Sequence, residues 1–276
     1  MVILGSGVQI NEVEGRKSLP RNISKTIDAR ASIAKVPWQV SLMMVSENSG
    51  VFYQCSGSII SSHWIVTAAS CVCANAKKLE SWNFVSAGSS DYKKRSRHKI
   101  VQQICHPLYK TRLETHLIGV HDIALLRVEE PFIFDRTRQP IPLYNGAFET
   151  VAQSLANTSG WGGTVAQRHN EMFHKLRFAT MKIISKAEHD ALTSKIYPKN
   201  PPTGQIWAKP LSGIVCYKDS GAPLTINGTL VGIASWLSRN YCTTDHPALY
   251  TEVAPHRSWI LENTLPSISS SVQPPP

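Results

Sequence analysis

The sequence lacks any apolar run of the roughly 18 residues that a membrane-spanning helix needs. It also lacks zinc-finger spacing, the aromatic motif of RNA-binding domains, a basic helix with heptads and any internal repeat. Only the positive charge would favour a nucleic-acid partner, so no nucleic acid is expected to bind. With 42% hydrophobic and 17% charged residues, the 276-residue chain has the composition of a globular protein with a sizeable core.

Acidic residues are the scarcer charge, with 19 Asp and Glu against 29 Lys and Arg. The formal net charge of +10 favours anionic partners, such as sulfated glycans, acidic protein patches or anionic lipid. The alternative is that this charge only keeps the chain soluble. No cofactor or metal is expected from the sequence.

Cysteine is sparse but even in number, and six residues allow 15 pairings: Cys55, Cys71, Cys73, Cys105, Cys216 and Cys242. Zinc is the less favoured reading, because only Cys71 and Cys73 are close together. Disulfides indicate an extracellular setting. Three glycosylation sequons agree with secretion, although such tripeptides also arise by chance; they begin at Asn22, Asn157 and Asn227.

Short strand-like runs separated by Gly, Pro, Asn and Ser begin at Trp38 and predict an all-β barrel or sandwich. Asn227 and Gly228 lie between two apolar runs and predict a hairpin with an exposed turn. A helix is expected over residues 255–265 and a disordered tail over 263–276. Residues 1–30 have the character of a leader or propeptide, although the apolar stretch at the start is too short for a signal peptide.

Eight segments then occur in an order and spacing that together resemble the chymotrypsin/trypsin family of serine proteases. They are VPWQVSL (36–42), CSGSII (55–60), WIVTAASC (64–71), DIALL (122–126), SGWG (159–162), DSGAP (219–223), SW (235–236) and PALYT (247–251). The resemblance implies two six-stranded antiparallel β-barrels with a cleft between them and a C-terminal helix. The domain would cover residues 31–262, divided near residue 145.

The resemblance implies that Ser220 is at the nucleophile position and Asp122 at the position of the acid that orients the base. Ser70, however, stands where the family has the catalytic histidine. A hydroxyl cannot accept a proton near neutral pH, and loss of the base in a related triad costs about 10⁶-fold in turnover. His63 and His121 are the nearest candidates for a relocated base, and both are better explained as surface or interface histidines.

Further departures affect the oxyanion hole and the specificity pocket. Lys218 replaces a family glycine whose N–H is an oxyanion donor, and lysine disfavours the backbone angles that glycine adopts, so the peptide is expected to flip. Four residues are expected to narrow or close the pocket, namely Ile214 at its floor, Tyr217 at its rim, Leu237 and Ala248. An open apolar pocket is the alternative.

The family's activation sequence, Ile-Val-Gly-Gly, is absent near residues 25–29, so Asp219 is expected to need a partner other than a new N-terminus. The resemblance also implies disulfides Cys55–Cys71 and Cys216–Cys242, which leaves Cys73 to pair with Cys105. The acidic residues of the family's calcium loop are missing, so no calcium is expected.

A basic run in the first predicted barrel includes Lys93, Lys94, Arg95, Arg97 and Lys99. It is either a solvated face or a binding site for a polyanion or an acidic protein surface.

Among relatives of this family, the chain most resembles the inactivated serine protease paralogues of parasitic mites, which are related to the group 3 mite allergens. That resemblance implies a secreted pseudoprotease that binds host defence proteins, such as components of complement. One alternative is an endopeptidase with residual or atypical activity. Another is a polyanion-binding module.

Overall fold

The computed structural model describes residues 31–46, 50–73, 82–91, 94, 96–110, 120–162, 174–196, 203–213, 218–235 and 247–265. The expected leader lies outside these residues, as does most of the expected tail. In the described part of the chain, no helix is both long and apolar enough to cross a membrane.

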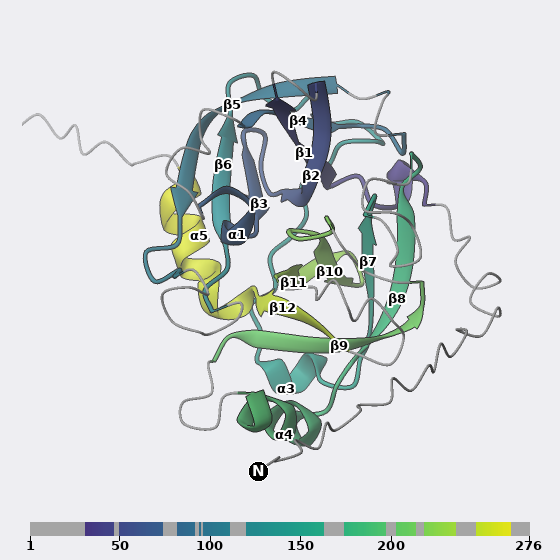
Figure 1. Cartoon of the computed structure of the whole chain (residues 1–276), viewed down its shortest axis with the longest axis vertical. Coiled ribbons are helices and arrows are strands. Elements are labelled where there is room, and N and C mark those ends of the chain that lie inside the picture. The colour runs from purple at the N-terminus through teal and green to yellow at the C-terminus, as the bar shows by residue number, and fades with distance from the viewer. Residues whose placement is uncertain are drawn as a thin grey trace, which may run out of the picture.

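The first six strands close into one antiparallel barrel in the order β1-β2-β3-β6-β5-β4 (Figure 1). Their bounds are β1 Gln39–Ser46, β2 Gly50–Ile59, β3 Trp64–Thr67, β4 Trp82–Ala87, β5 Ser96–Cys105 and β6 Ala124–Val128. Alternate residues of these strands point into the barrel, so Val40 and Leu42 are fully buried with Ile65, Val85 and Leu125. Gly57 makes room for this packing, since a Cβ there would lie 2.8 Å from Ile65 Cγ2.

The second six strands close into another antiparallel barrel in the order β10-β11-β12-β9-β8-β7. Their bounds are β7 Leu155–Gly160, β8 Arg177–Ile183, β9 Gln205–Ser212, β10 Pro223–Ile226, β11 Thr229–Ala234 and β12 Ala248–Glu252. The architecture of two six-stranded antiparallel barrels expected from the sequence is confirmed. The division expected near residue 145 lies in the segment between β6 and β7.

The hairpin predicted at Asn227 and Gly228 joins β10 to β11. Both turn residues have positive φ, 48° and 74°, as a type I′ turn requires. This turn follows the right-handed twist of the two strands, which explains why the Asn-Gly pair is a strong local signal.

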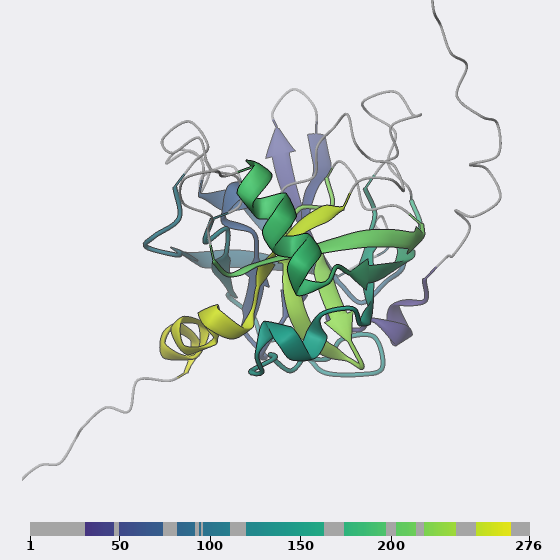
Figure 2. The same cartoon turned by 90° about the horizontal axis from the view of Figure 1, so that it is seen from below.

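Helices are short and lie outside the barrels (Figure 2). They are η2 Ile33–Lys35, α1 Ala69–Val72, α3 Phe148–Val151, α4 Lys186–Ile196, η4 Ala254–His256 and α5 Arg257–Thr264. The predicted C-terminal helix is therefore confirmed, with Ile260 packed into the core cluster of the first barrel. The start of the disordered tail expected from the sequence, at residue 263, is too early, because residues 263 and 264 belong to α5.

Candidate active site

Ser70 lies on α1, directly after β3, and faces the carboxyl group of Asp122. Its backbone N–H donates to Asp122 Oδ1 at 2.6 Å, and its hydroxyl donates to Asp122 Oδ2 at 2.9 Å. The short turn of α1 aims both donors of one residue at one carboxylate. Ser70 therefore takes the acid as a hydrogen-bond partner, which is the contact that a catalytic base would make.

Asp122 precedes β6 and is 2% exposed. Besides Ser70, the Ser235 hydroxyl donates to its Oδ2 at 2.6 Å, from the end of β11 in the other barrel. Burial raises the pKa of Asp122, while the hydrogen bonds from Ser235 and Ser70 oppose this rise. The carboxylate thus links the two barrels through the hydroxyl groups of Ser70 and Ser235. Both of these groups act as hydrogen-bond donors to Asp122, and neither is a base that could take a proton from Ser220.

Ser220 is held on the loop before β10 by backbone contacts with both barrels. Its carbonyl accepts from Ser56 N at 2.8 Å, and the next residue, Gly221, donates to Ala234 O at 2.7 Å. Gly221 has φ 83°, and a Cβ there would lie 2.1 Å from Ser56 O, so only glycine fits. The Ser220 hydroxyl donates to the carbonyl of Ser235 at 3.4 Å.

Neither histidine considered as a substitute base contacts Ser220 within the described residues. His63 Nδ1 is paired with Ser62 Oγ at 3.2 Å. His121 lies in the turn before β6 with φ 49°. Its ring instead contacts His256, with Nδ1 and Nε2 3.0 Å apart.

Lys218 does adopt the backbone region that it was expected to avoid, with φ 74°. The local fold holds it there, because the loop is tied down by the Ser220 and Gly221 hydrogen bonds that follow it. A left-handed conformation costs a non-glycine residue about 1–2 kcal/mol. The expectation of a flipped peptide therefore loses its basis, because Lys218 tolerates the positive φ at the cost of local backbone strain.

Asp219 is 5% exposed and sits between two glycines that follow or end β7. Its Oδ1 accepts from Gly162 N at 2.9 Å. A Cβ at Gly160 or Gly162 would lie 2.1 Å or 2.5 Å from its carboxyl atoms, so these glycines create the space for the side chain. The backbone N–H of Gly162 is thus one partner of Asp219. In the family this acid pairs with the new N-terminus of the Ile-Val-Gly-Gly sequence, which is absent near residues 25–29.

Three of the four residues expected to shape the specificity pocket, Ile214, Tyr217 and Leu237, lie outside the described residues. The fourth, Ala248, begins β12, pairs with Ala208 and packs against the core of the second barrel. The narrowing of the pocket remains a prediction.

Two disulfides cross the first barrel and match pairings expected from the sequence. Cys55 is bonded to Cys71, which fixes α1 against β2 next to Ser70. Cys73 is bonded to Cys105, which ties the end of α1 to the end of β5. The expected Cys216–Cys242 pair lies outside the described residues.

The described members of the basic run, Lys94, Arg97 and Lys99, are all exposed. Arg97 and Lys99 lie on the outer face of β5, since His98 between them is buried. Arg97 stacks 4.7 Å from the centre of the Phe84 ring, and Lys99 pairs with Glu129 at 3.2 Å. Lys93 and Arg95 lie outside the described residues.

The two described sequons occupy different settings. Asn227 is exposed at the tip of the β10–β11 hairpin, as expected. Asn157 is half-buried in the middle of β7, paired with Thr180 on one side and Thr225 on the other. Asn22 lies outside the described residues.

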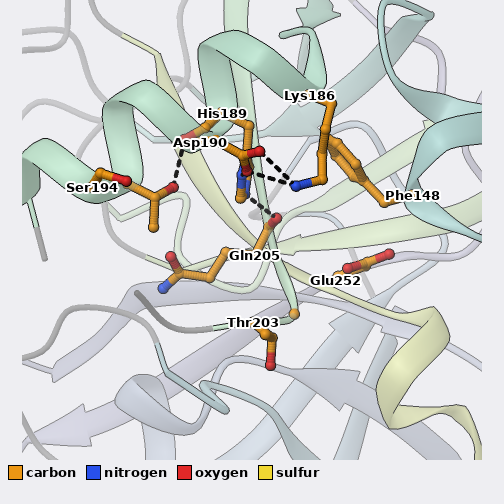
Figure 3. Close-up of a pocket in the computed structure, with 10 residues that line it drawn as sticks. Phe148, Lys186, His189, Asp190, Ser194, Thr203, Gln205 and Glu252 are labelled. Carbon is orange, nitrogen blue, oxygen red and sulfur yellow. Dashed lines mark hydrogen bonds and ion pairs between the residues drawn. The ribbon is translucent and has the colours of Figure 1, made fainter. Parts of the chain in front are cut away.

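A pocket in the second barrel lies beside α4 and shares no residue with the Ser70, Asp122 and Ser220 site (Figure 3). Lys186 and Asp190 form an ion pair at its edge, 2.7 Å apart, and the His189 ring is bonded to the backbone carbonyl of Gln205 at 3.0 Å. Its polar groups are thus largely engaged with one another.

The geometry and fold agree with comparisons to known proteins. Residues 28–260 match the family model named Trypsin, so the chain belongs to the trypsin family of serine proteases. A trypsin of Phaedon cochleariae is 30% identical, over 85% of this chain and 86% of its own length. A trypsin of Simulium vittatum is 33% identical, over 74% of this chain and 78% of its own.

Among solved structures, a scabies mite inactivated protease paralogue, S-D1, superposes with a TM-score of 0.68 at 24% identity. The match covers 90% of this chain and 98% of that one. At this identity the likeness shows a shared fold.

Sequence reasoning missed Ser235 as a partner of Asp122 and missed the contact between His121 and His256. In both cases the partners come from different parts of the chain, 113 and 135 residues apart, and no local pattern connects them.

Proposed function

We propose that this chain is a secreted, proteolytically inactive member of the trypsin family that acts by binding. The observation that carries the proposal is the double hydrogen bond from Ser70 to Asp122. The acid of the triad is satisfied by a hydroxyl that cannot take a proton from Ser220. Without a base, the serine hydroxyl stays protonated and is a poor nucleophile.

An active-site fluorophosphonate probe tests the loss of catalysis on the full chain. We expect no labelling of Ser220 above that of a Ser220→Ala variant under conditions that label trypsin completely. Stoichiometric labelling of Ser220 would overturn the proposal and favour the alternative of an endopeptidase with atypical activity.

We further propose that the partner is a protein of a host defence protease cascade, such as complement. Two features support a binding role: disulfides still brace the site that lost its base, and the chain has an excess of positive charge. Dose-dependent inhibition of complement lysis in host serum is the expected result. Serum lysis unchanged at micromolar protein would exclude complement as the target.

A second candidate function is polyanion binding through Lys94, Arg97 and Lys99, favoured by the outward placement of Arg97 and Lys99 on one strand face. The triple variant with glutamine at these positions should elute from heparin at lower salt. A matched triple variant at the exposed residues Lys35, Arg136 and Lys195 removes the same charge elsewhere. Equal loss of retention in both variants would show that only net charge matters.

We also propose that the secreted chain is N-glycosylated at Asn227, which is the better placed of the two described sequons because its turn is exposed. When the chain is secreted from insect cells, Asn227→Gln should remove one glycan and increase gel mobility. A chain that carries its glycan at Asn157 and none at Asn227 would contradict this assignment.

A further inference from the structure

Three histidines from distant segments meet at the surface between the first barrel and the C-terminal helix. His106 follows β5, His121 lies in the turn before β6, and His256 ends η4. One ring nitrogen from each can be chosen so that all three lie within 4.8 Å of one another. His256 is 3% exposed, and the other two are half-buried and reachable from solvent.

Hydrogen bonds orient His256 with the lone pair of its Nε2 toward His121. Its Nδ1 donates to the backbone carbonyl of Glu252 at 2.7 Å, so its Nε2 is the unprotonated nitrogen. That Nε2 accepts a hydrogen bond from His121 Nδ1 at 3.0 Å, so a metal that binds both nitrogens replaces this proton, and His121 then carries its proton on Nε2. A histidine whose second nitrogen donates to a carbonyl is the usual arrangement of a metal ligand, because the bond fixes both tautomer and ring direction.

We propose that His106, His121 and His256 form a zinc-binding site, with water as the fourth ligand. Imidazole suits zinc, and no carboxylate belongs to the cluster, which disfavours calcium and magnesium. Two nitrogens bound tetrahedrally to zinc at 2.0–2.1 Å lie about 3.3 Å apart. The His121–His256 spacing of 3.0 Å is already close to this value.

His106 is the ligand whose side chain must rotate before the three histidines can bind one ion. Its ring is stacked on that of His121, with centroids 4.8 Å apart and an interplanar angle of 10°, so it must rotate to aim a nitrogen at the ion. Its Nδ1 accepts a long hydrogen bond, 3.3 Å, from Leu108 N, and its ring also contacts those of His256 and Trp259 edge-on. Rotation of one half-buried side chain therefore completes the site without moving the backbone.

Zinc at this position would connect three segments of the fold. His121 immediately precedes Asp122, while His256 leads into α5. A bound ion would fix the turn before β6 against the C-terminal helix. The inference does not depend on whether Ser220 is reactive, so its test and the probe-labelling test can fail separately.

Titration of the metal-free full chain with zinc chloride at pH 7.5, followed by calorimetry, tests the site. We expect one zinc ion per chain with a micromolar or lower dissociation constant, a raised thermal midpoint and no competition from millimolar magnesium. His106→Gln and His121→Gln should each weaken binding at least tenfold. Both residues are half-buried, and circular dichroism confirms that the variants fold.

His189→Gln is the matched control, since His189 is half-buried and lies beside the carboxylate of Asp190. It should bind zinc as the wild type does. Trp259, whose ring centre is 4.9 Å from that of His106, adds a second readout, because Cu²⁺ at the site should quench its fluorescence and Trp259→Phe should remove that quenching. No stoichiometric zinc binding, or binding lost only in His189→Gln, would overturn the proposal.

Discussion

Ser70 gives Asp122 two hydrogen-bond donors, a hydroxyl and a backbone N–H. Neither group can accept a proton near neutral pH, and this is the basis of the proposed loss of catalysis. Lys218 already occupies the left-handed backbone conformation that favours glycine, so it adds local strain and gives no sign of a flipped peptide.

Restoring the histidine should recover little activity, because the residues expected to narrow the pocket, Ile214, Tyr217 and Leu237, remain. We expect Ser70→His alone to label Ser220 with a fluorophosphonate far more slowly than trypsin is labelled. Because Lys218 already has a positive φ, adding Lys218→Gly should raise the free energy of unfolding by about 1–2 kcal/mol and change labelling little. Full trypsin-like turnover by Ser70→His alone would refute this account.

Glu252 makes the stability depend on pH. Burial and the nearby Glu149 raise its pKa from 4.5 to about 7. The folded state then holds a proton that the unfolded state has lost between these values, so stability falls as pH rises from about 4.5 to about 7. Glu252→Gln does not titrate and should be about 1–2 kcal/mol more stable than the wild type at pH 8, after allowing for solvent screening.

Urea unfolding at pH 4 and pH 8 measures this difference. The two proteins should have similar stability at pH 4, where both states of the wild type are protonated at Glu252. An equal difference at both pH values would show that the carboxyl group does not titrate as described.

At the scale of elements, two turn glycines serve different purposes. Gly228 in the β10–β11 hairpin has φ 74°, and a Cβ there would meet nothing within 4 Å. Gly221 has φ 83°, and a Cβ there would collide with the backbone of β2 at Ser56. The first needs glycine for its conformation alone, and the second for both conformation and space.

Gly228→Ala should thus cost about 1 kcal/mol of unfolding free energy. Gly221→Ala should cost several times more, or prevent folding, because β2 and the Ser220 loop must separate. Thermal unfolding of the two variants compares them, and similar midpoints would contradict the close approach of loop and strand.

At the scale of the whole molecule, Asp122 is a junction between the barrels. It binds Ser70 in the first barrel and Ser235 in the second, and its backbone carbonyl accepts from Thr251 Oγ1 on β12 at 3.0 Å. These contacts give the buried carboxylate a structural role that does not depend on catalysis.

Ser235→Ala should destabilise the protein by about 1–3 kcal/mol, because it removes one donor from a buried carboxylate. Ser62→Ala is the control. It also removes one hydroxyl, whose described hydrogen bond is with the neighbouring His63 and not with a buried carboxylate. Equal stability of the two variants would show that Asp122 does not need its contact with the second barrel.

The sequence by itself determined the all-β class, the Asn227–Gly228 turn and the C-terminal helix, because strand punctuation, a turn pair and helical spacing act within a few residues. The two six-stranded barrels and the expected positions of Ser70, Asp122 and Ser220 came instead from the resemblance to a known family, which rests on the order of motifs along the whole chain. The family's ordered motifs also anticipated the Cys55–Cys71 and Cys73–Cys105 disulfides.

Only the tertiary structure decided the rest. Closure of the barrels brings Ser235 to Asp122 and gathers His106, His121 and His256 from segments that no sequence pattern relates. Tight packing of the Ser220 loop also keeps Lys218 at a positive φ that its own preference opposes. In each case many long-range contacts outweigh a local tendency of about 1–2 kcal/mol, which is why the residue alone did not predict the outcome.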